Sequence, residues 1–148
     1  MPKPARRCSP KLEDAGIRFA NRFFIPRSHA GRCRQVLRGW YFDRAREKIL
    51  PRVRSHAMRL GVEFNHSGIV DNRYRWGSCT AKDNVNFNWR LIKTPMFVID
   101  YVVIHELAHL IEANHTPRFW SIVSAQTANM ERARKWLREN GQCLEEDV

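Results

Sequence analysis

His105-Glu106-Leu107-Ala108-His109 is the most informative part of this chain, because it combines two histidines four residues apart with a glutamate beside the first. On an α-helix, residues four apart lie on the same face, so the two imidazoles can converge on one metal ion. Glu106 lies at the flank of that face, where a carboxylate can take a proton from a metal-bound water. The pattern therefore predicts a helix that carries a zinc site with its own general base.

His115 offers a third nitrogen ligand just beyond this helix. Three protein ligands leave one position of a tetrahedral zinc ion open, which is typical of catalytic sites, whereas structural zinc sites are closed by a fourth ligand. We therefore predict one Zn²⁺ ion, with His105, His109 and His115 as its ligands and Glu106 as the catalytic residue.

Other side chains leave alternatives open. Glu112 is a rival third ligand or a partner that orients an imidazole, and Glu131 in the following helix is a second rival. Cys79 could reach the metal as an inhibitory thiolate, although a free thiol is the simpler interpretation. Tyr101 lies one turn before the first histidine, where core packing is its simpler use. The remaining histidines, His29, His56 and His66, lack ligand spacing and are expected on the surface.

The composition is that of a globular protein. With 148 residues, of which 43% are hydrophobic, the chain is long enough for one core. No apolar run reaches the length of a membrane span, and the basic N-terminus lacks the apolar segment of a secretory signal, so we expect a cytoplasmic protein. The four cysteines are scattered without a C-x-x-C pair, which favours free thiols.

The positive charge is concentrated in the first part of the chain. Residues 1–61 hold 16 of the 26 Lys and Arg residues but 4 of the 15 Asp and Glu residues. Such a basic segment is a possible nucleic-acid partner, but no helix-turn-helix, zinc-finger or RNP pattern accompanies it. We divide the chain into a basic, partly irregular arm over 1–30 and one domain over 31–148. The oligomeric state cannot be predicted.

Apolar residues recur every fourth position over 31–60, which predicts an amphipathic helix that Pro51 kinks or splits and that Gly61 ends. Residues 62–90 favour strands instead: a short strand over 62–64, a turn over 65–68, a strand over 69–76 and a loop over 77–83. Residues 84–89 alternate strictly, with Asn on one face and apolar residues on the other. This strand could present a sheet edge to an extended peptide, with Asn86 and Asn88 as substrate contacts.

Two helices complete the chain. Thr94-Pro95 and Thr116-Pro117 are helix-start signals, a capping threonine followed by proline. They predict an apolar, buried helix to about Glu112 and a last helix to about Asn140. The fold class is therefore α+β, a small antiparallel sheet packed on the helix of the metal site.

The spacing of the three histidines matches the metzincin pattern, but two features exclude that family. Metzincins have glycine where this chain has Glu112, and the sequence around Met130 does not resemble a Met-turn. The turn toward His115 would then have to be made at Ala113-Asn114, where asparagine tolerates a left-handed conformation.

A closer resemblance covers roughly residues 36–140. The chain resembles the YgjP-like metallopeptidase domain, which is related to the SprT-like and WLM families. The resemblance is carried by Arg75-Trp76-Gly77-Ser78-Cys79, Asn88-Trp89-Arg90-Leu91-Ile92, Tyr101-Val102-Val103-Ile104-His105-Glu106-Leu107-Ala108-His109-Leu110, Asn114-His115 and Phe119-Trp120.

This resemblance implies a minimal zincin with the zinc ligands and the catalytic glutamate at the positions already named, and it places Arg75 near the substrate cleft. The implied activity is hydrolysis of peptide bonds in a peptide or protein substrate. Two alternatives stay open: a nucleotide pyrophosphatase of UTP type that uses the same zinc site, and an SprT-like protease brought to DNA by the basic N-terminal helix.

Overall fold

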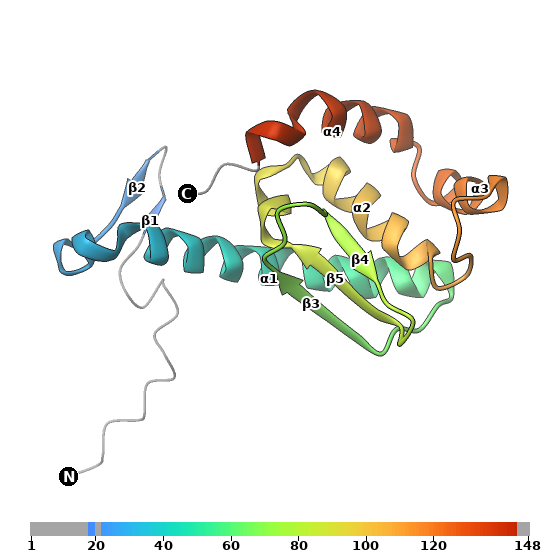
Figure 1. The fold of residues 1–148 in the computed structure, drawn as a ribbon, viewed down its shortest axis with the longest axis horizontal. Coiled ribbons are helices and arrows are strands. Elements are labelled where there is room, and N and C mark those ends of the chain that lie inside the picture. The colour runs from blue at the N-terminus through green and yellow to red at the C-terminus, as the bar shows by residue number, and fades with distance from the viewer. Residues whose placement is uncertain (1–17, 20–21, 145–148) are drawn as a thin grey trace, which may run out of the picture. The chain divides into compact units, whose positions relative to one another are not determined.

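The computed structural model describes residues 18, 19 and 22–144 (Figure 1). Most of the expected arm and the acidic end of the chain, residues 145–147, lie outside this part. Contacts divide the chain into two compact units, with the boundary between Arg44 and Ala45. The described part contains four α-helices and two small sheets, which confirms the α+β class. The boundary expected at residue 30 stays a prediction.

An aromatic cluster organises the first unit. Two short strands, β1 (Arg18–Phe19) and β2 (Phe23–Phe24), pair in antiparallel fashion. Phe23 meets Trp40 edge-on with 5.0 Å between ring centroids, and Tyr41 with 5.8 Å. Edge-to-face contacts of this kind contribute to stability beyond the area that they bury. The hairpin is therefore attached to the beginning of the long helix that follows it.

The long helix α1 (Cys33–Leu60) is preceded by a 3-10 helix over Arg27–Arg32. Pro51 does not split α1, because the helix continues through it. The helix ends at Gly61 as predicted, and the φ angle of +69° at this glycine is one that other residues rarely adopt.

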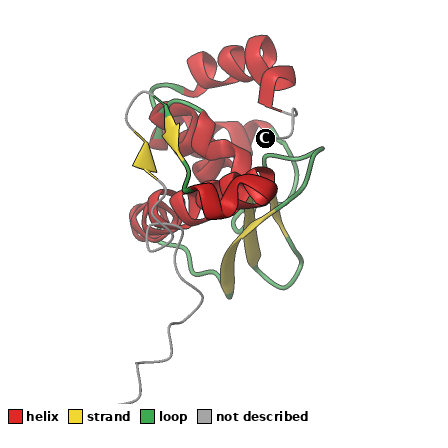
Figure 2. Ribbon diagram, turned by 90° about the vertical axis from the view of Figure 1, so that its left-hand side faces the viewer, coloured by secondary structure: helices red, strands yellow, loops and turns green. Residues whose placement is uncertain are grey.

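The sheet of the second unit has three strands, β3 (His66–Val70), β4 (Gly77–Cys79) and β5 (Asn84–Asn88), shown side by side in Figure 2. Their order is β3-β5-β4. The strand β5 runs parallel to β3 and antiparallel to β4, so the sheet is mixed rather than antiparallel as expected. A tight connection with φ +58° at Asp83 joins β4 to β5.

Four predictions for this region are wrong, the first being the short strand over 62–64, where no strand forms. The turn over 65–68 falls inside β3, most of the strand over 69–76 is a loop, and β4 lies in the predicted loop over 77–83. The strand β5 is central, so it offers no free edge to a peptide. The strand β4 is hard to predict from sequence because Gly77-Ser78-Cys79 are small residues without the alternation of a half-buried strand.

The helix α2 (Met96–Ala108) is the centre of the second unit. It contacts β4 and β5 of the sheet, and it also packs against α3 (Pro117–Gln126) and α4 (Met130–Leu144). This position explains why its middle is apolar on nearly every side. Its most deeply buried side chains are fully removed from solvent; they are Val98, Val103, Ile104, Leu107 and Ala108. The helix ends four residues earlier than predicted, and the single last helix predicted to about Asn140 is wrong, because this stretch forms two helices, α3 and α4.

The two capping signals have different outcomes. Thr116 caps α3 as predicted, because its side-chain oxygen accepts a hydrogen bond from the backbone N–H of Phe119 at 3.3 Å. Thr94 does not cap α2: its hydroxyl donates backwards to the carbonyl of Leu91 at 2.7 Å. Thr94 is the C-cap of the 3-10 helix over Trp89–Lys93, and this helix supplies the competing acceptor.

A polar cluster joins α1 to α2. Arg52 binds the carboxylate of Asp100 through two nitrogens, at 2.7 and 2.8 Å, and Nε2 of His56 lies 2.9 Å from the same carboxylate. His56 is therefore buried, and its expected place on the surface is wrong. None of the described helices combines the length and the hydropathy needed to cross a lipid bilayer.

Candidate metal centre

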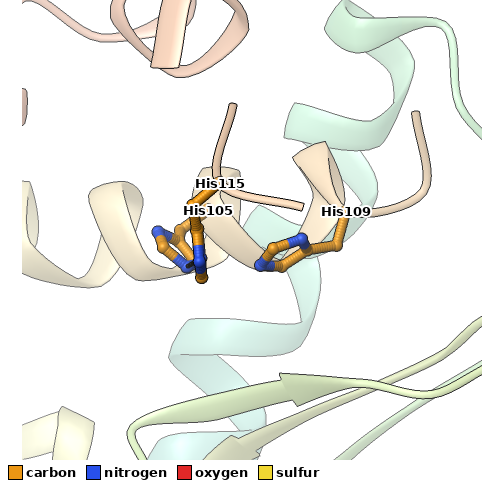
Figure 3. A group of neighbouring side chains, drawn as sticks. All are labelled: His105, His109 and His115. Atoms are coloured by element: carbon orange, nitrogen blue, oxygen red, sulfur yellow. Dashed lines mark hydrogen bonds between the residues drawn. The ribbon is translucent and has the colours of Figure 1, made fainter. Parts of the chain in front are cut away.

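His105, His109 and His115 come together at the C-terminal end of α2 (Figure 3). One nitrogen of each ring lies within 4.8 Å of the others, and the Nε2 atoms of His105 and His115 are 3.2 Å apart. His105 lies in the last turn of α2 and His109 is its C-cap residue, while His115 directly precedes the cap of α3. The fold thus brings the three predicted ligands into one group.

Hydrogen bonds at the outer nitrogens orient two of the rings. Nδ1 of His109 lies 3.2 Å from the carbonyl oxygen of Glu112. Because a carbonyl only accepts, Nδ1 donates and the lone pair is left on Nε2. Nδ1 of His105 lies 3.5 Å from the hydroxyl of Tyr101, which gives Tyr101 a contact beyond core packing. Partners of this kind fix the ring orientation of metal-binding histidines.

The chain passes from α2 to α3 without a left-handed residue at Asn114. Among the described residues other than glycine, a positive φ occurs at Asp83 alone, so the conformation expected at Asn114 is wrong. The N–H of Glu112 donates to the carbonyl of Ala108 at 2.9 Å, and the N–H of Thr116 donates to the carbonyl of Asn114 at 2.8 Å. Ordinary turns of this kind are enough to carry the third histidine back.

Two aromatic residues of α3 support the imidazoles. Phe119, fully buried, stacks on His109 at a centroid distance of 4.5 Å and meets His105 and His115 edge-on, each at 4.9 Å. Trp120 stacks on His115 at 5.6 Å with an interplanar angle of 21°. The cap of α3 therefore places the ring of Phe119 among all three histidines.

The donor set fits a zinc ion. Burial, with smaller contributions from the neighbouring histidines and Arg134, lowers the pKa of His105 to about 4, and burial also lowers the pKa of His109. Both rings are therefore neutral near pH 7, which is the form that binds metal. Two nitrogens on one tetrahedral zinc ion lie about 3.4 Å apart, given bonds of about 2.1 Å, and the Nε2 atoms of His105 and His115 already approach that separation.

Glu106 lies beside this group and is 8% exposed. Burial raises the pKa of its carboxyl to about 7, and the positive charge of Arg75 opposes the rise. No hydrogen bond to this carboxylate is found among the described residues. A carboxyl group with a pKa near neutrality can both accept and release a proton at physiological pH, which is what general acid–base catalysis requires.

Gly77 of β4 determines where the Glu106 side chain can lie. A Cβ atom at this position would lie 2.8 Å from Cγ and 3.1 Å from Oε1 of Glu106. Real Cβ atoms do not approach other atoms so closely, so the absence of a side chain gives the glutamate its space. Gly77 lies inside the Arg75–Cys79 motif, but a glycine in a sequence does not reveal which side chain it makes room for.

A cavity of about 240 Å³ opens at this point. Its walls are the beginning of β4 with the two residues before it, α2 and α4. The residues that line it are Arg75, Trp76, Gly77, Tyr101, Val102, His105, Glu106 and Leu137. The cavity therefore brings the first histidine of the motif and the glutamate next to space for a substrate.

The three predicted substrate contacts occupy different places. Arg75 lines the cavity, and no hydrogen bond or ion pair of its guanidinium group occurs among the described residues. Asn86 lies on β5, opposite Ser78 of β4. Asn88 is buried, and its amide nitrogen donates to the carbonyls of Asn72 and Arg75, so its contacts hold the loop that carries Arg75.

The rival residues lie outside the described metal group. The carboxylate of Glu112 lies 3.8 Å from Arg118, and its backbone carbonyl instead orients His109. Glu131 forms an exposed pair with Arg134 at 3.3 Å. Cys79 is a free thiol whose pKa is raised by burial and by the charge of Glu106, so the neutral form is favoured.

Comparisons with known proteins agree with this geometry. A sequence model of the YgjP-like metallopeptidase domain matches residues 10–140. Among solved structures, the fold is similar to the metallopeptidase zymogen jannalysin of Methanocaldococcus jannaschii, with a TM-score of 0.53 and 17% sequence identity. The alignment covers 64% of this chain and 96% of that one, and at this identity it shows the fold alone. No curated protein matches the chain.

The family match extends over most of the chain and includes the histidines, the glutamate and the loop of Arg75. The metal that such a domain implies is typically zinc, and the neutral imidazoles at the end of α2 suit it. The chain belongs to the YgjP-like family and is, at the level of that family, a zinc metallopeptidase.

Proposed function

We propose that the protein hydrolyses peptide bonds with one Zn²⁺ ion held by His105, His109 and His115 and with Glu106 as the general base. The observation that supports this most is the convergence of three imidazoles beside a buried carboxyl group at the wall of a cavity. Zinc, when bound, supplies a Lewis acid and lowers the pKa of water toward neutrality.

The side chains of this chain move the protons. Glu106 takes the proton of the attacking water on its carboxylate and then passes it to the nitrogen of the leaving amine. Burial raises the pKa of Glu106 to about 7, and a carboxyl group with this pKa can release the proton again near neutral pH. Gly77 leaves the carboxylate free to face the cavity.

The substrate binds along the sheet. The strand β4 pairs with β5 on one side only, and among the described strands its other edge has no partner. An extended peptide can therefore add main-chain hydrogen bonds to β4 beside Glu106, in place of the edge first expected on β5. Arg75 contacts the peptide from the cavity wall, and Asn86 contacts it from the neighbouring strand β5. Asn88 holds the Arg75 loop in place through its hydrogen bond to the carbonyl of Arg75.

Replacement of Glu106 by Gln tests the assignment. We expect the zinc-loaded E106Q variant to keep its metal but to lose peptide hydrolysis by about 10²–10⁴-fold, since an amide cannot accept the proton. Metal content per chain and the rate of cleavage of a peptide mixture are the two measurements. Full activity in E106Q would contradict the role of Glu106, and loss of the metal would show a structural effect instead.

A second candidate, hydrolysis of a nucleoside triphosphate at the same site, is supported by the free guanidinium group of Arg75, since arginine binds phosphate well. The same two protein samples, supplied with UTP, distinguish it: release of pyrophosphate that depends on Glu106, without cleavage of peptides, would replace the peptidase proposal. Recruitment to DNA by the basic N-terminal segment stays a prediction that salt-dependent retention on DNA can test.

A further inference from the structure

Arg134 of α4 contacts a tryptophan ring that in turn stacks on a histidine of the metal group. Its guanidinium carbon is 4.6 Å from the centre of the Trp120 ring. Trp120 in turn stacks on the imidazole of His115. A cation is thereby held at a definite place beside the metal group, although α4 contributes no ligand.

The contact with Trp120 involves the charge of the guanidinium group and the face of the ring, and the N–H donors of the group are what can bind a carboxylate. The ion pair that the structure gives Arg134 is with Glu131, one hydrogen bond of 3.3 Å. The Glu131 side chain is 72% exposed and that of Arg134 is 37% exposed. Exposed pairs three residues apart on a helix contribute little to stability, so a second carboxylate can take the place of Glu131 at small cost.

Arg134 belongs to a helix that forms part of the cavity wall. Leu137, one turn further along α4, lines the cavity together with Tyr101. The Trp120 ring below Arg134 also meets His105, which lines the cavity, at a centroid distance of 5.8 Å. Arg75 lines the cavity from the loop before β4, and Glu106 is the one acidic side chain among the described lining residues. Positive charge therefore lies on both sides of the site.

We propose that Arg134, held on Trp120, is a specificity residue that binds a carboxylate of the peptide substrate, so that acidic peptides are the preferred substrate class. The inference rests on the proposed peptidase function. The carboxylate can belong to an Asp or Glu side chain or to a free C-terminus, because the edge of a guanidinium group binds both in the same way.

Peptide binding to zinc-loaded E106Q, measured by calorimetry, tests this without turnover. Three alanine-based hexapeptides form the set: one with a single Glu and an amidated end, one with Gln and a free C-terminal carboxylate, and one with Gln and an amidated end. We expect at least one acidic peptide to bind about tenfold more tightly than the neutral one. The acidic peptide that gains identifies the source of the carboxylate.

Further replacement of Arg134 by Gln in this variant should remove the tenfold difference and leave the neutral peptide unaffected. Arg134→Lys should give an intermediate difference, because an ammonium group keeps the charge but cannot lie flat on Trp120. Arg138→Gln is the matched control: it removes the same charge one turn along α4 from an exposed side chain, and the preference should stay.

Equal binding of all three peptides, or equal weakening of all three by Arg134→Gln, would overturn the inference. Dependence of the preference on Arg138 as well would overturn it too, since a general field of α4 would then be the cause. The proposed function fails separately, if the wild-type zinc enzyme cleaves no peptide at all. The two failures are distinguishable because binding is measured in a variant that does not turn over.

Discussion

The helix α2 carries two acidic residues six positions apart whose surroundings are opposite. Asp100 is surrounded by donors: burial alone would raise its pKa, but hydrogen bonds from Arg52 and His56 hold it well below the ordinary range. No described residue donates a hydrogen bond to Glu106, and burial raises its pKa to about 7. Each lies near at least one histidine, so residue types alone do not distinguish the two places.

The difference lies in whether the charge is matched. The Asp100 carboxylate is matched by Arg52 and His56, so this cluster contributes to stability. The three histidines instead place one ring nitrogen each within reach of the others. The carboxyl group of Glu106, which can bind a proton, lies at the wall of a cavity. Perturbed groups that the fold leaves unmatched are typical of functional sites.

Replacement of one histidine in each place should separate the two roles most strongly. We expect His109→Ala to weaken zinc binding by more than about a hundredfold, because even partners that only orient a ligand contribute tenfold to a hundredfold. His56→Ala should leave zinc binding unchanged and lower the free energy of unfolding of the metal-free protein by about 1.5 kcal/mol. Competition with a zinc chelator and urea unfolding measure the two effects. A clear loss of zinc in His56→Ala would remove the distinction.

Gly77→Ala sharpens the functional half of the comparison. The added Cβ would displace the Glu106 side chain, and a displacement of about 1 Å at a catalytic group can lower the rate about 10²-fold. Zinc content should not change. Gly141→Ala is the control, because its Cβ would meet the Trp76 ring at an ordinary 3.9 Å. Equal activity of the two variants would show that Gly77 does not position the glutamate.

Asp100→Asn addresses the structural half. It leaves Arg52 without a carboxylate, and since the Arg52 side chain is 36% exposed, we expect a loss of about 2 kcal/mol in unfolding free energy rather than the larger cost of a fully buried pair. Activity per folded, zinc-loaded molecule should be that of the wild type. Reduced activity at full zinc occupancy would show that the two places on α2 are coupled.

The pH dependence of stability has a definite sign at Asp100. A carboxyl whose pKa is lowered by folding stabilises the protein above its unfolded pKa, about 3.9, and this contribution is lost as the pH falls below that value. The metal-free wild type should therefore lose more unfolding free energy between pH 6 and pH 3 than Asp100→Asn does. Urea unfolding at both pH values gives the comparison, and parallel losses would contradict it.

Much of the site could be predicted because its signals are local. The four-residue spacing of His105 and His109 needs only a helix, and Thr116-Pro117 determines where α3 begins. The role of a side chain whose partners are chosen by the fold is harder to predict from sequence. Glu112 orients an imidazole, one of its two expected uses, but it does so through its backbone carbonyl, which every residue possesses.

The sheet was predicted less well for a related reason. Strand signals depend on alternation, and β4 is three small residues whose partner is chosen by packing against α2. The parallel pairing of β3 with β5 joins segments that are not consecutive strands, so no turn in the sequence marks it. The burial of His56 likewise depends on Asp100, which is 44 residues away.

His109 closes α2 as its C-cap, and this has a consequence for how metal affinity is determined. The proposed ligand set extends across a helix end, so its third member is positioned by the corner between α2 and α3 and not by helical periodicity. The cap at Thr116 and the ring of Phe119 rigidify that corner before any ion arrives, and the entropic cost of ordering the ligands falls on the folding of the chain. Preorganisation of the corner over residues 109–116 would then contribute to how tightly a metal is retained.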